Sequence, residues 1–268
     1  MARRERLDKN SGEVEKTHET QMNQPLITVV TPTTGNTTLE QAIHSVQAQT
    51  YQNIQHLIVI DGQYPDAEQI VSRFQTVDVV RLPYPTGTNR FNGHRIYGAS
   101  GFLAKGEYLA FLDEDNWFES NHIDSLYSVI QAGNTWAYSL RKIFDQSGKF
   151  ICHDDCESLG KWPTVMSPED FLIDVNCYLL PRQWALNTSY LWYRKFREPG
   201  QMEVDRVLLK ALKLLELSFD CTFQYSTCYR TGNTQNSVTS NFFLKGNQQM
   251  LEFYKGTLPW KKDKLRNV

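Results

Sequence analysis

The stretch Glu107-Tyr108-Leu109-Ala110-Phe111-Leu112-Asp113-Glu114-Asp115-Asn116 joins a short apolar run directly to three consecutive acidic residues. A run of this length, rich in aliphatic and aromatic residues, is typical of a buried β-strand. The acids then follow the carboxyl end of that strand. In open α/β sheets, ligands bind in the crevice beyond the carboxyl ends of the strands. We therefore expect a ligand site at Asp113–Asp115.

Two earlier segments have the same form. Leu26–Thr31 is a β-branched run that ends at Pro32, and His56–Ile60 is an apolar run that ends at Asp61-Gly62. Between them, apolar residues recur at helical spacing, and Thr37 and Glu40 have the spacing of a capping box. Strands that alternate with helices predict an α/β fold with a Rossmann-like, mostly parallel central sheet flanked by helices.

The rest of the chain is less regular. We expect strands at Trp136–Ile143 and Ile173–Leu180 and a helix at Glu203–Leu217. Residues 1–24 are polar and lack apolar periodicity, which predicts a disordered N-terminal arm. Residues 25–245 then form one α/β domain, and residues 246–268 form a C-terminal tail or a peripheral helix.

Composition narrows the class of protein. Of the 268 residues, 40% are hydrophobic and 22% charged, as in an ordinary globular enzyme. A net charge of -2 provides no overall field for nucleic acid, so no nucleic-acid partner is expected. No run approaches the roughly 18–20 apolar residues of a transmembrane helix, and no signal peptide is evident. We expect a cytoplasmic protein, for which peripheral membrane contact stays possible.

The five cysteines do not suggest a disulfide framework, because their number is odd and their spacing irregular. Cys152 and Cys156 flank His153 at a spacing that zinc could use. No second Cys/His pair lies at a suitable distance, so the sequence does not favour a zinc site.

The acidic residues at strand ends indicate a cation and nucleotide site. Asp113 and Asp115 are oxygen ligands of the kind that Mg²⁺ or Mn²⁺ shares with substrate phosphates. Surface solvation or helix capping is the alternative. Asp61 could accept a hydrogen bond from a base or a ribose hydroxyl, although an Asp-Gly turn would also explain it. Thr31, Pro32 and Thr33 begin a loop that offers hydroxyl and backbone N–H groups to the same ligand.

These pieces together resemble glycosyltransferase family 2, inverting enzymes with a GT-A fold. The similarity covers about Pro25 to Asp115: Leu26–Thr33 resembles the opening strand and its Pro-Thr turn, and Leu109–Asn116 resembles the metal-binding motif. The resemblance implies that residues 25–245 are a GT-A domain that binds a nucleoside-diphosphate sugar, with a UDP-sugar favoured, and Mn²⁺ or Mg²⁺. It also implies transfer to a saccharide or lipid-linked acceptor, with Asp113 and Glu114 at the donor.

Three further residues are assigned only by this resemblance. Arg95 would contact the nucleotide or diphosphate, with a structural salt bridge as the alternative. Asp205 would be the catalytic base, with Glu203 as the second candidate; acids in a first helical turn are also favoured by the macrodipole alone. Arg230 would neutralise phosphate, or else belong to an ordinary polar loop. Asn176 and Cys177 are placed on the acceptor side.

Two other functions stay open. The fold could serve as a non-catalytic nucleotide-sugar binding or scaffold protein, because the Glu203–Asp205 segment departs from the family pattern. A sugar-phosphate nucleotidyltransferase usually has a glycine-rich, basic loop after the first strand. Residues Thr31–Asn36 contain one glycine and no basic residue, so we rank this alternative lower.

Overall fold

The computed structural model describes residues 24–88, 91–165, 171–193, 204–232 and 238–261. The strands are β1 (Ile27–Thr33), β2 (Ile54–Ile60), β3 (Val77–Arg81), β4 (Tyr108–Phe111), β5 (Trp117–Phe118), β6 (Trp136–Phe144), β7 (Phe150–His153), β8 (Tyr178–Pro181) and β9 (Phe219–Arg230). The helices are α2 (Leu39–Gln47), α3 (Pro65–Val71), α4 (His94–Leu103), α5 (His122–Gln131), α6 (Arg182–Asn187), α7 (Val204–Leu214) and α8 (Ser240–Phe253), with 3₁₀ turns η1 (Val175–Cys177) and η2 (Ser189–Leu191).

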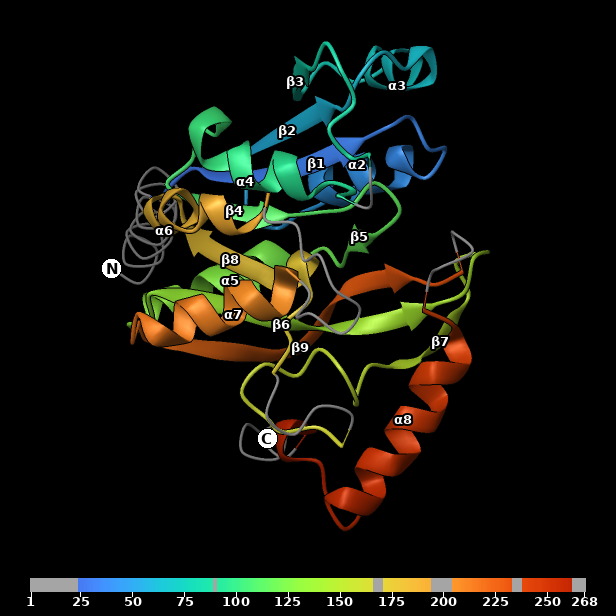
Figure 1. Cartoon of the computed structure of the whole chain (residues 1–268), viewed down its shortest axis with the longest axis vertical. Coiled ribbons are helices and arrows are strands. Elements are labelled where there is room, and N and C mark those ends of the chain that lie inside the picture. The colour runs from blue at the N-terminus through green and yellow to red at the C-terminus, as the bar shows by residue number, and fades with distance from the viewer. Residues whose placement is uncertain (1–23, 89–90, 166–170, 194–203, 233–237, 262–268) are drawn as a thin grey trace, which may run out of the picture.

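The sheet has the strand order β3-β2-β1-β4-β8-β6-β9-β5, and β7 pairs with β6. In the first half, β1 runs parallel to β2 and β4, and β2 runs parallel to β3, as the strand–helix alternation predicted. The second half is mixed, because β8 is antiparallel to both neighbours while β6 and β9 are parallel. The arrowheads of β1, β2, β6 and β9 point to the same side of the molecule (Figure 1).

Residues along a strand point alternately to the two faces of the sheet. Because both faces are buried here, the strand sequences are continuous apolar runs. In β4, Leu109 and Phe111 pack in the same cluster as α4 residues Ile96 and Tyr97. The intervening Ala110 packs instead in a cluster with residues of α2 and α5. Figure 1 shows α4, α6 and α7 on the face toward the viewer and α5 behind the sheet. Both faces of the central strands are therefore covered.

Two local predictions were wrong. The expected capping box does not form: α2 begins at Leu39, and its preceding residue Thr38 makes no side-chain cap. With Thr38 at the N-cap, Glu40 is the second helical residue, whereas a capping box needs the acid at the third, and Glu40 forms an ion pair with Arg73 at 3.0 Å. The strand expected from Ile173 begins only at Tyr178, because the Asp174 carboxylate caps Asn176 N at 2.9 Å and starts η1.

The end of the described chain belongs to the same core. Helix α8 continues through the domain limit expected at residue 245. Met250 and Trp260 are buried in the main hydrophobic cluster. The Trp260 indole donates from Nε1 to Asp155 Oδ1 at 2.8 Å. The predicted N-terminal arm lies outside the described residues, apart from Gln24. No described helix has both the length and the apolar composition needed to cross a membrane.

Candidate functional site

A cleft of about 710 Å³ lies beyond the carboxyl ends of β1, β2 and β4. Four of the carboxylates that line it come from three separate parts of the chain, Asp61, Asp113, Asp115 and Asp205, and Glu114 and Asp174 line it as well. The topology explains the first three, because β2, β1 and β4 are parallel neighbours and end at one edge of the sheet. The Asp61 backbone N–H donates to Thr33 O at 2.9 Å, and Leu112 N–H donates to Val30 O at 2.9 Å. These bonds hold the three strand ends together.

Asp113 is held by hydrogen bonds on both carboxylate oxygens. Tyr97 OH donates to Oδ1 at 2.5 Å, and Asn176 Nδ2 donates to Oδ2 at 2.8 Å. Burial, and next the negative charge of Asp115, raises the pKa of Asp113 to about 7. A positive charge nearby would therefore strongly favour the ionised form of this carboxyl group.

The residues present fit a hard divalent cation. Asp113 and Asp115 line the same cleft, and the charge on Asp115 acts on Asp113. Each carboxylate oxygen has two lone pairs, so Asp113 keeps acceptor capacity beside its hydrogen bonds from Tyr97, Asn176 and, at 3.5 Å, Asn116. Among the described residues, no three His, Cys, Asp or Glu side chains converge on one metal position. Mg²⁺ needs no such cage when substrate phosphates complete its coordination.

Glu114 has a different set of contacts. Its carboxylate accepts from the Thr33 hydroxyl, from Thr34 Oγ1 at 3.0 Å and from Asn36 N at 3.0 Å. It therefore connects the end of β4 to the loop after β1. In this arrangement Glu114 shapes the loop that was predicted to contact the donor.

Asp61 is 4% exposed and holds the loop that follows β3. Its Oδ1 accepts from Thr86 N and Thr86 Oγ1, both at 2.7 Å, and its Oδ2 accepts from Gly87 N at 2.8 Å. Asp61 also lines the cleft, together with Tyr64 and Pro85. The arrangement leaves room for a ligand beside a carboxylate that is already oriented by the protein.

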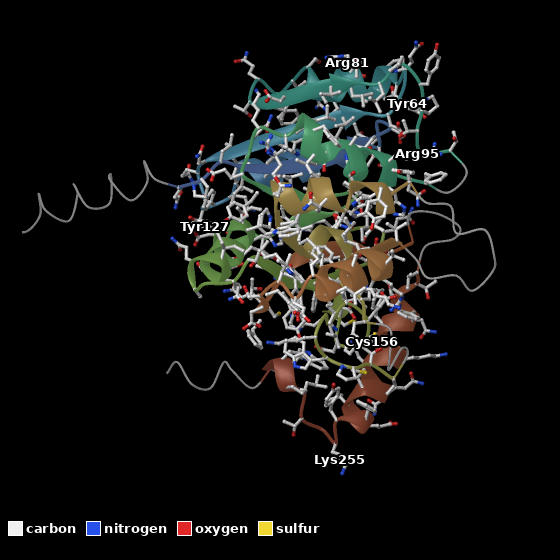
Figure 2. All side chains as sticks on the ribbon, turned by 60° about the vertical axis from the view of Figure 1, so that its left-hand side comes forward. Tyr64, Arg81, Arg95, Tyr127, Cys156 and Lys255 are labelled. Carbon is white, nitrogen blue, oxygen red and sulfur yellow. The ribbon has the colours of Figure 1, made fainter. Side chains whose placement is uncertain are left out.

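Two candidate binding residues lie off the cleft lining. Thr31 is fully buried in β1, with its hydroxyl 3.0 Å from His56 Nε2. Arg95 stacks on the Phe91 ring, 3.7 Å from its centroid, and donates from Nη1 to Thr86 O at 2.9 Å. Figure 2 shows Arg95 on the same side of the molecule as the cleft residue Tyr64. Arg95 therefore supports the loop that Asp61 also holds.

Arg230 ends β9 beside the acidic cluster. Its backbone N–H donates to Asn116 Oδ1 at 2.9 Å, and its Nε donates to Asp115 O at 3.0 Å. The guanidinium also contacts Gln146 O and Gln41 Oε1 and lies 4.9 Å from the Trp117 ring centroid. A fixed, 6% exposed positive charge therefore lines the cleft.

Asp205 lies in the first turn of α7, and its side chain lines the cleft. Burial, and next the charge of Asp205, raises the pKa of Tyr178 well above its usual value. The second predicted acid, Glu203, lies outside the described residues. The helix therefore brings Asp205 to the cleft that holds the strand-end acids.

The sequence did not predict the contacts by which Tyr97, Asp174 and Asn176 hold the site. Tyr97 occupies an apolar position of α4, and Asp174 and Asn176 precede β8 within an apolar run. Asn176 and Cys177, predicted on the acceptor side, are both fully buried and do not line the cleft. Polar residues within an apolar stretch of chain were the only indication available for Asp174 and Asn176.

The residues between Cys152 and Cys156 make contacts with other parts of the protein. Asp154 pairs with Arg141, with Nε and Oδ2 2.7 Å apart. The His153 ring stacks on Tyr225 at a centroid distance of 4.1 Å. His153 and Asp154 therefore have protein partners in the described structure.

Comparison with known proteins agrees with this geometry. A family model described as "Glycosyl transferase family 2" matches residues 28–176. The glycosyltransferase GlyG of Streptococcus pneumoniae is 34% identical over 172 residues, which cover 61% of this chain and 53% of the relative. A Campylobacter jejuni relative named as a GalNAc(5)-diNAcBac-PP-undecaprenol beta-1,3-glucosyltransferase is 28% identical over 56% of this chain and 48% of its own length. The chain thus spans about half the length of these two curated relatives.

The fold also resembles solved structures. Staphylococcus aureus TarS 1-349, solved in complex with UDP-GlcNAc, superposes with a TM-score of 0.58 at 11% identity. The alignment covers 91% of this chain and 76% of that one. At this identity the similarity demonstrates the GT-A-like fold.

Proposed function

Because the chain belongs to glycosyltransferase family 2, we propose that it transfers a sugar from a nucleoside-diphosphate donor to an acceptor hydroxyl, with inversion at the anomeric carbon. One observation carries the proposal: Asp61, Asp113, Asp115 and Asp205 line a single cleft at the carboxyl edge of the sheet. A binding site for a charged donor and a base for an acceptor would thus lie in one place.

The donor side lies between β1, β2 and β4. Asp61 and the loop at Thr86 and Gly87 would receive the nucleoside, with a UDP-sugar favoured. The complex of TarS with UDP-GlcNAc supports this choice through the shared fold. Arg230 supplies positive charge near the diphosphate, where charge-assisted hydrogen bonds are strongest.

Asp115, together with Asp113, would hold Mn²⁺ or Mg²⁺. When bound, such a cation offsets negative charge that develops on the departing diphosphate. The Tyr97 and Asn176 hydrogen bonds keep the Asp113 carboxylate oriented toward this role.

Asp205 would accept the proton of the acceptor hydroxyl as that oxygen attacks the anomeric carbon. Asp205 lies at the start of α7 and lines the same cleft as the strand-end acids, so it would be within the donor site. General-base assistance of this kind is worth about 10²–10⁴ in rate. The acceptor would be a saccharide or a lipid-linked saccharide, and the name of the Campylobacter jejuni relative supports the second class.

A donor screen tests the proposal. Purified chain is incubated with UDP-, GDP- and dTDP-sugars in Mn²⁺, and release of the nucleoside diphosphate is measured with and without saccharide acceptors. We expect turnover of at least one UDP-sugar and its loss in EDTA. Binding of UDP without turnover of any donor would favour the non-catalytic alternative. Failure to bind any nucleotide would overturn both.

A further inference from the structure

A buried charge cluster lies directly behind the cleft. Arg141 of β6 is 2% exposed, and its guanidinium contacts three carboxylates. Its Nε donates to Asp154 Oδ2 at 2.7 Å, its Nη1 to Asp174 Oδ2 at 2.5 Å, and its Nη2 to Glu157. The guanidinium also lies 4.5 Å from the centroid of the Tyr229 ring. These contacts hold the Arg141 guanidinium in one position.

Of the three carboxylates, Asp174 also lines the cleft, whereas Asp154 and Glu157 are not among its lining residues. Asp174 uses Oδ2 for Arg141, whereas its Oδ1 accepts from Asn176 N at 2.9 Å and from Asn176 Nδ2 at 2.8 Å. The Asp174 backbone N–H donates to Ser158 Oγ at 2.8 Å. Asp174 is thus held in one orientation, and it presents an acceptor to the Asn176 amide.

The Asn176 side chain links this cluster to Asp113. Its Nδ2 donates to Asp113 Oδ2 at 2.8 Å and to Asp174 Oδ1, while its Oδ1 accepts from Asp113 N at 2.6 Å. Because a backbone N–H can only donate, the amide oxygen must face it, so both amide hydrogens face the carboxylates. Asn176 is 0% exposed and does not line the cleft, so its influence on a ligand can only be indirect.

We propose that Arg141, Asp174 and Asn176 form a positioning relay that holds the Asp113 carboxylate in the orientation required for cation-dependent nucleotide binding. The inference rests on the proposed function, because it concerns the same cleft. Outer hydrogen-bond partners of a ligating carboxylate commonly determine its orientation. Buried charge clusters are in general a poor source of stability, which leaves orientation as the reason to keep this one.

Asn176→Ala tests the relay, and Glu157→Gln is its control. Both variants alter the same buried cluster. Glu157, however, contacts Arg141 without touching Asp174, Asn176 or Asp113 in any hydrogen bond of the described residues. Calorimetry measures UDP affinity for each variant and for the unsubstituted chain, once with Mn²⁺ and once with EDTA. The binding stoichiometry reports the fraction of folded protein, separately from the affinity.

We expect Asn176→Ala to weaken UDP binding in Mn²⁺ about 10–100-fold and to leave binding in EDTA unchanged. Glu157→Gln should remain within about twofold in both conditions, because the glutamine amide oxygen can still accept from Arg141 and Arg141 keeps its bonds to Asp154 and Asp174. A purely structural role would reduce the stoichiometry or weaken binding equally in both conditions, and either result would overturn the relay. If Asn176→Ala does not fold, Asn176→Ser replaces it, with the same expected loss in Mn²⁺ only, because a single hydroxyl cannot replace both amide donors.

Different results would overturn the proposed function and the positioning relay. Absence of Mn²⁺-dependent UDP binding by the unsubstituted chain would overturn the proposed function and this inference with it. Normal Mn²⁺-dependent binding by folded Asn176→Ala would overturn the relay alone.

Discussion

Asn176 and Asp113 exchange two hydrogen bonds although they are 63 residues apart: Asn176 Nδ2 donates to Asp113 Oδ2 at 2.8 Å, and Asp113 N donates to Asn176 Oδ1 at 2.6 Å. The pair joins the acidic end of β4 to the turn before β8. The geometry of the acidic cluster thus depends on a segment outside the cluster. This dependence guides the choice of variants below, which separate cation-dependent binding, loop support, proton transfer and stability.

Asp205→Asn should abolish transfer but preserve donor binding. The amide keeps the volume of the carboxylate and cannot accept the proton, so we expect kcat to fall about 10²–10⁴-fold. Steady-state kinetics with the UDP-sugar identified by the screen measures the loss, and calorimetry checks the UDP affinity. Asp220→Asn is the control, since Asp220 pairs with Lys161 outside the cleft lining. An unchanged kcat in Asp205→Asn would exclude Asp205 as the base.

Asp115→Ala should weaken the binding of UDP itself. Removal of a cation ligand takes away attraction for the diphosphate, and we expect a loss of about tenfold or more in Mn²⁺. Calorimetry with Mn²⁺ and with EDTA provides the measurement. Asp124→Ala, on the exposed side of α5, removes the same charge far from the cleft lining and should bind normally. Equal UDP affinity for Asp115→Ala and Asp124→Ala would argue against a cation at Asp115.

Glu114→Gln should loosen the loop after β1. The carboxylate accepts only from donors of Thr33, Thr34 and Asn36, and an amide would place its own N–H groups against some of them. We expect UDP affinity to fall about threefold to tenfold, from a cost of ~1 kcal/mol. Glu68→Gln, at the exposed pair with Arg81, is the matched control. Unchanged affinity in Glu114→Gln would show that the loop does not need this support.

Acid should destabilise the fold partly through two buried histidines. Burial lowers the pKa of His56 and of His122 to about 3. Because the unfolded chain takes up protons below about pH 6.5 while the folded chain does not, the free energy of unfolding decreases as pH falls from about 6.5 toward 3. Each site contributes up to ~1.4 kcal/mol per pH unit in this range.

His122→Phe tests this pH dependence. The ring stacks on Phe118 at 3.8 Å between centroids, so phenylalanine preserves the packing but removes the titrating group. The free energy of unfolding is measured with urea between pH 4 and pH 7. It should change less steeply with pH in His122→Phe than in His44→Gln, which is the control because His44 is exposed. Identical slopes in the two variants would contradict the prediction.

Local patterns predicted the strands and helices that surround the site. The apolar runs before Asp61 and Asp113 became buried parallel strands, and the helical spacing after Leu39 became α2. These features follow from burial on both faces of a sheet and from a periodic helix face, which are properties of neighbouring residues. The capping box did not form because α2 begins after Thr38 and not after Thr37, and Glu40 pairs instead with Arg73, 33 residues away.

Some site residues were predicted from local sequence, and others were brought to the site only by the tertiary fold. Asp61, Asp113 and Asp115 were predicted to share an edge because parallel neighbouring strands end together, and all three line one cleft. Asp205 and Arg230 were assigned by resemblance, and the fold brings them to that cleft from α7 and β9. The roles of all five stay predictions until the variants are measured. The contacts of Tyr97 and Asn176 with Asp113 were not predicted, since they join segments that are far apart in the sequence.

By itself, the sequence determined the alternation of strands and helices, the parallel half of the sheet and the edge at which acids gather. Each of these depends on hydrophobic periodicity over a few residues. Only the tertiary structure decided which oxygens of those acids are already bonded: Glu114 to the loop at Thr33, Asp61 to Thr86, and Asp113 to Tyr97 and Asn176. Such bonds depend on how segments far apart in the chain pack together, and periodicity contains no information about that packing.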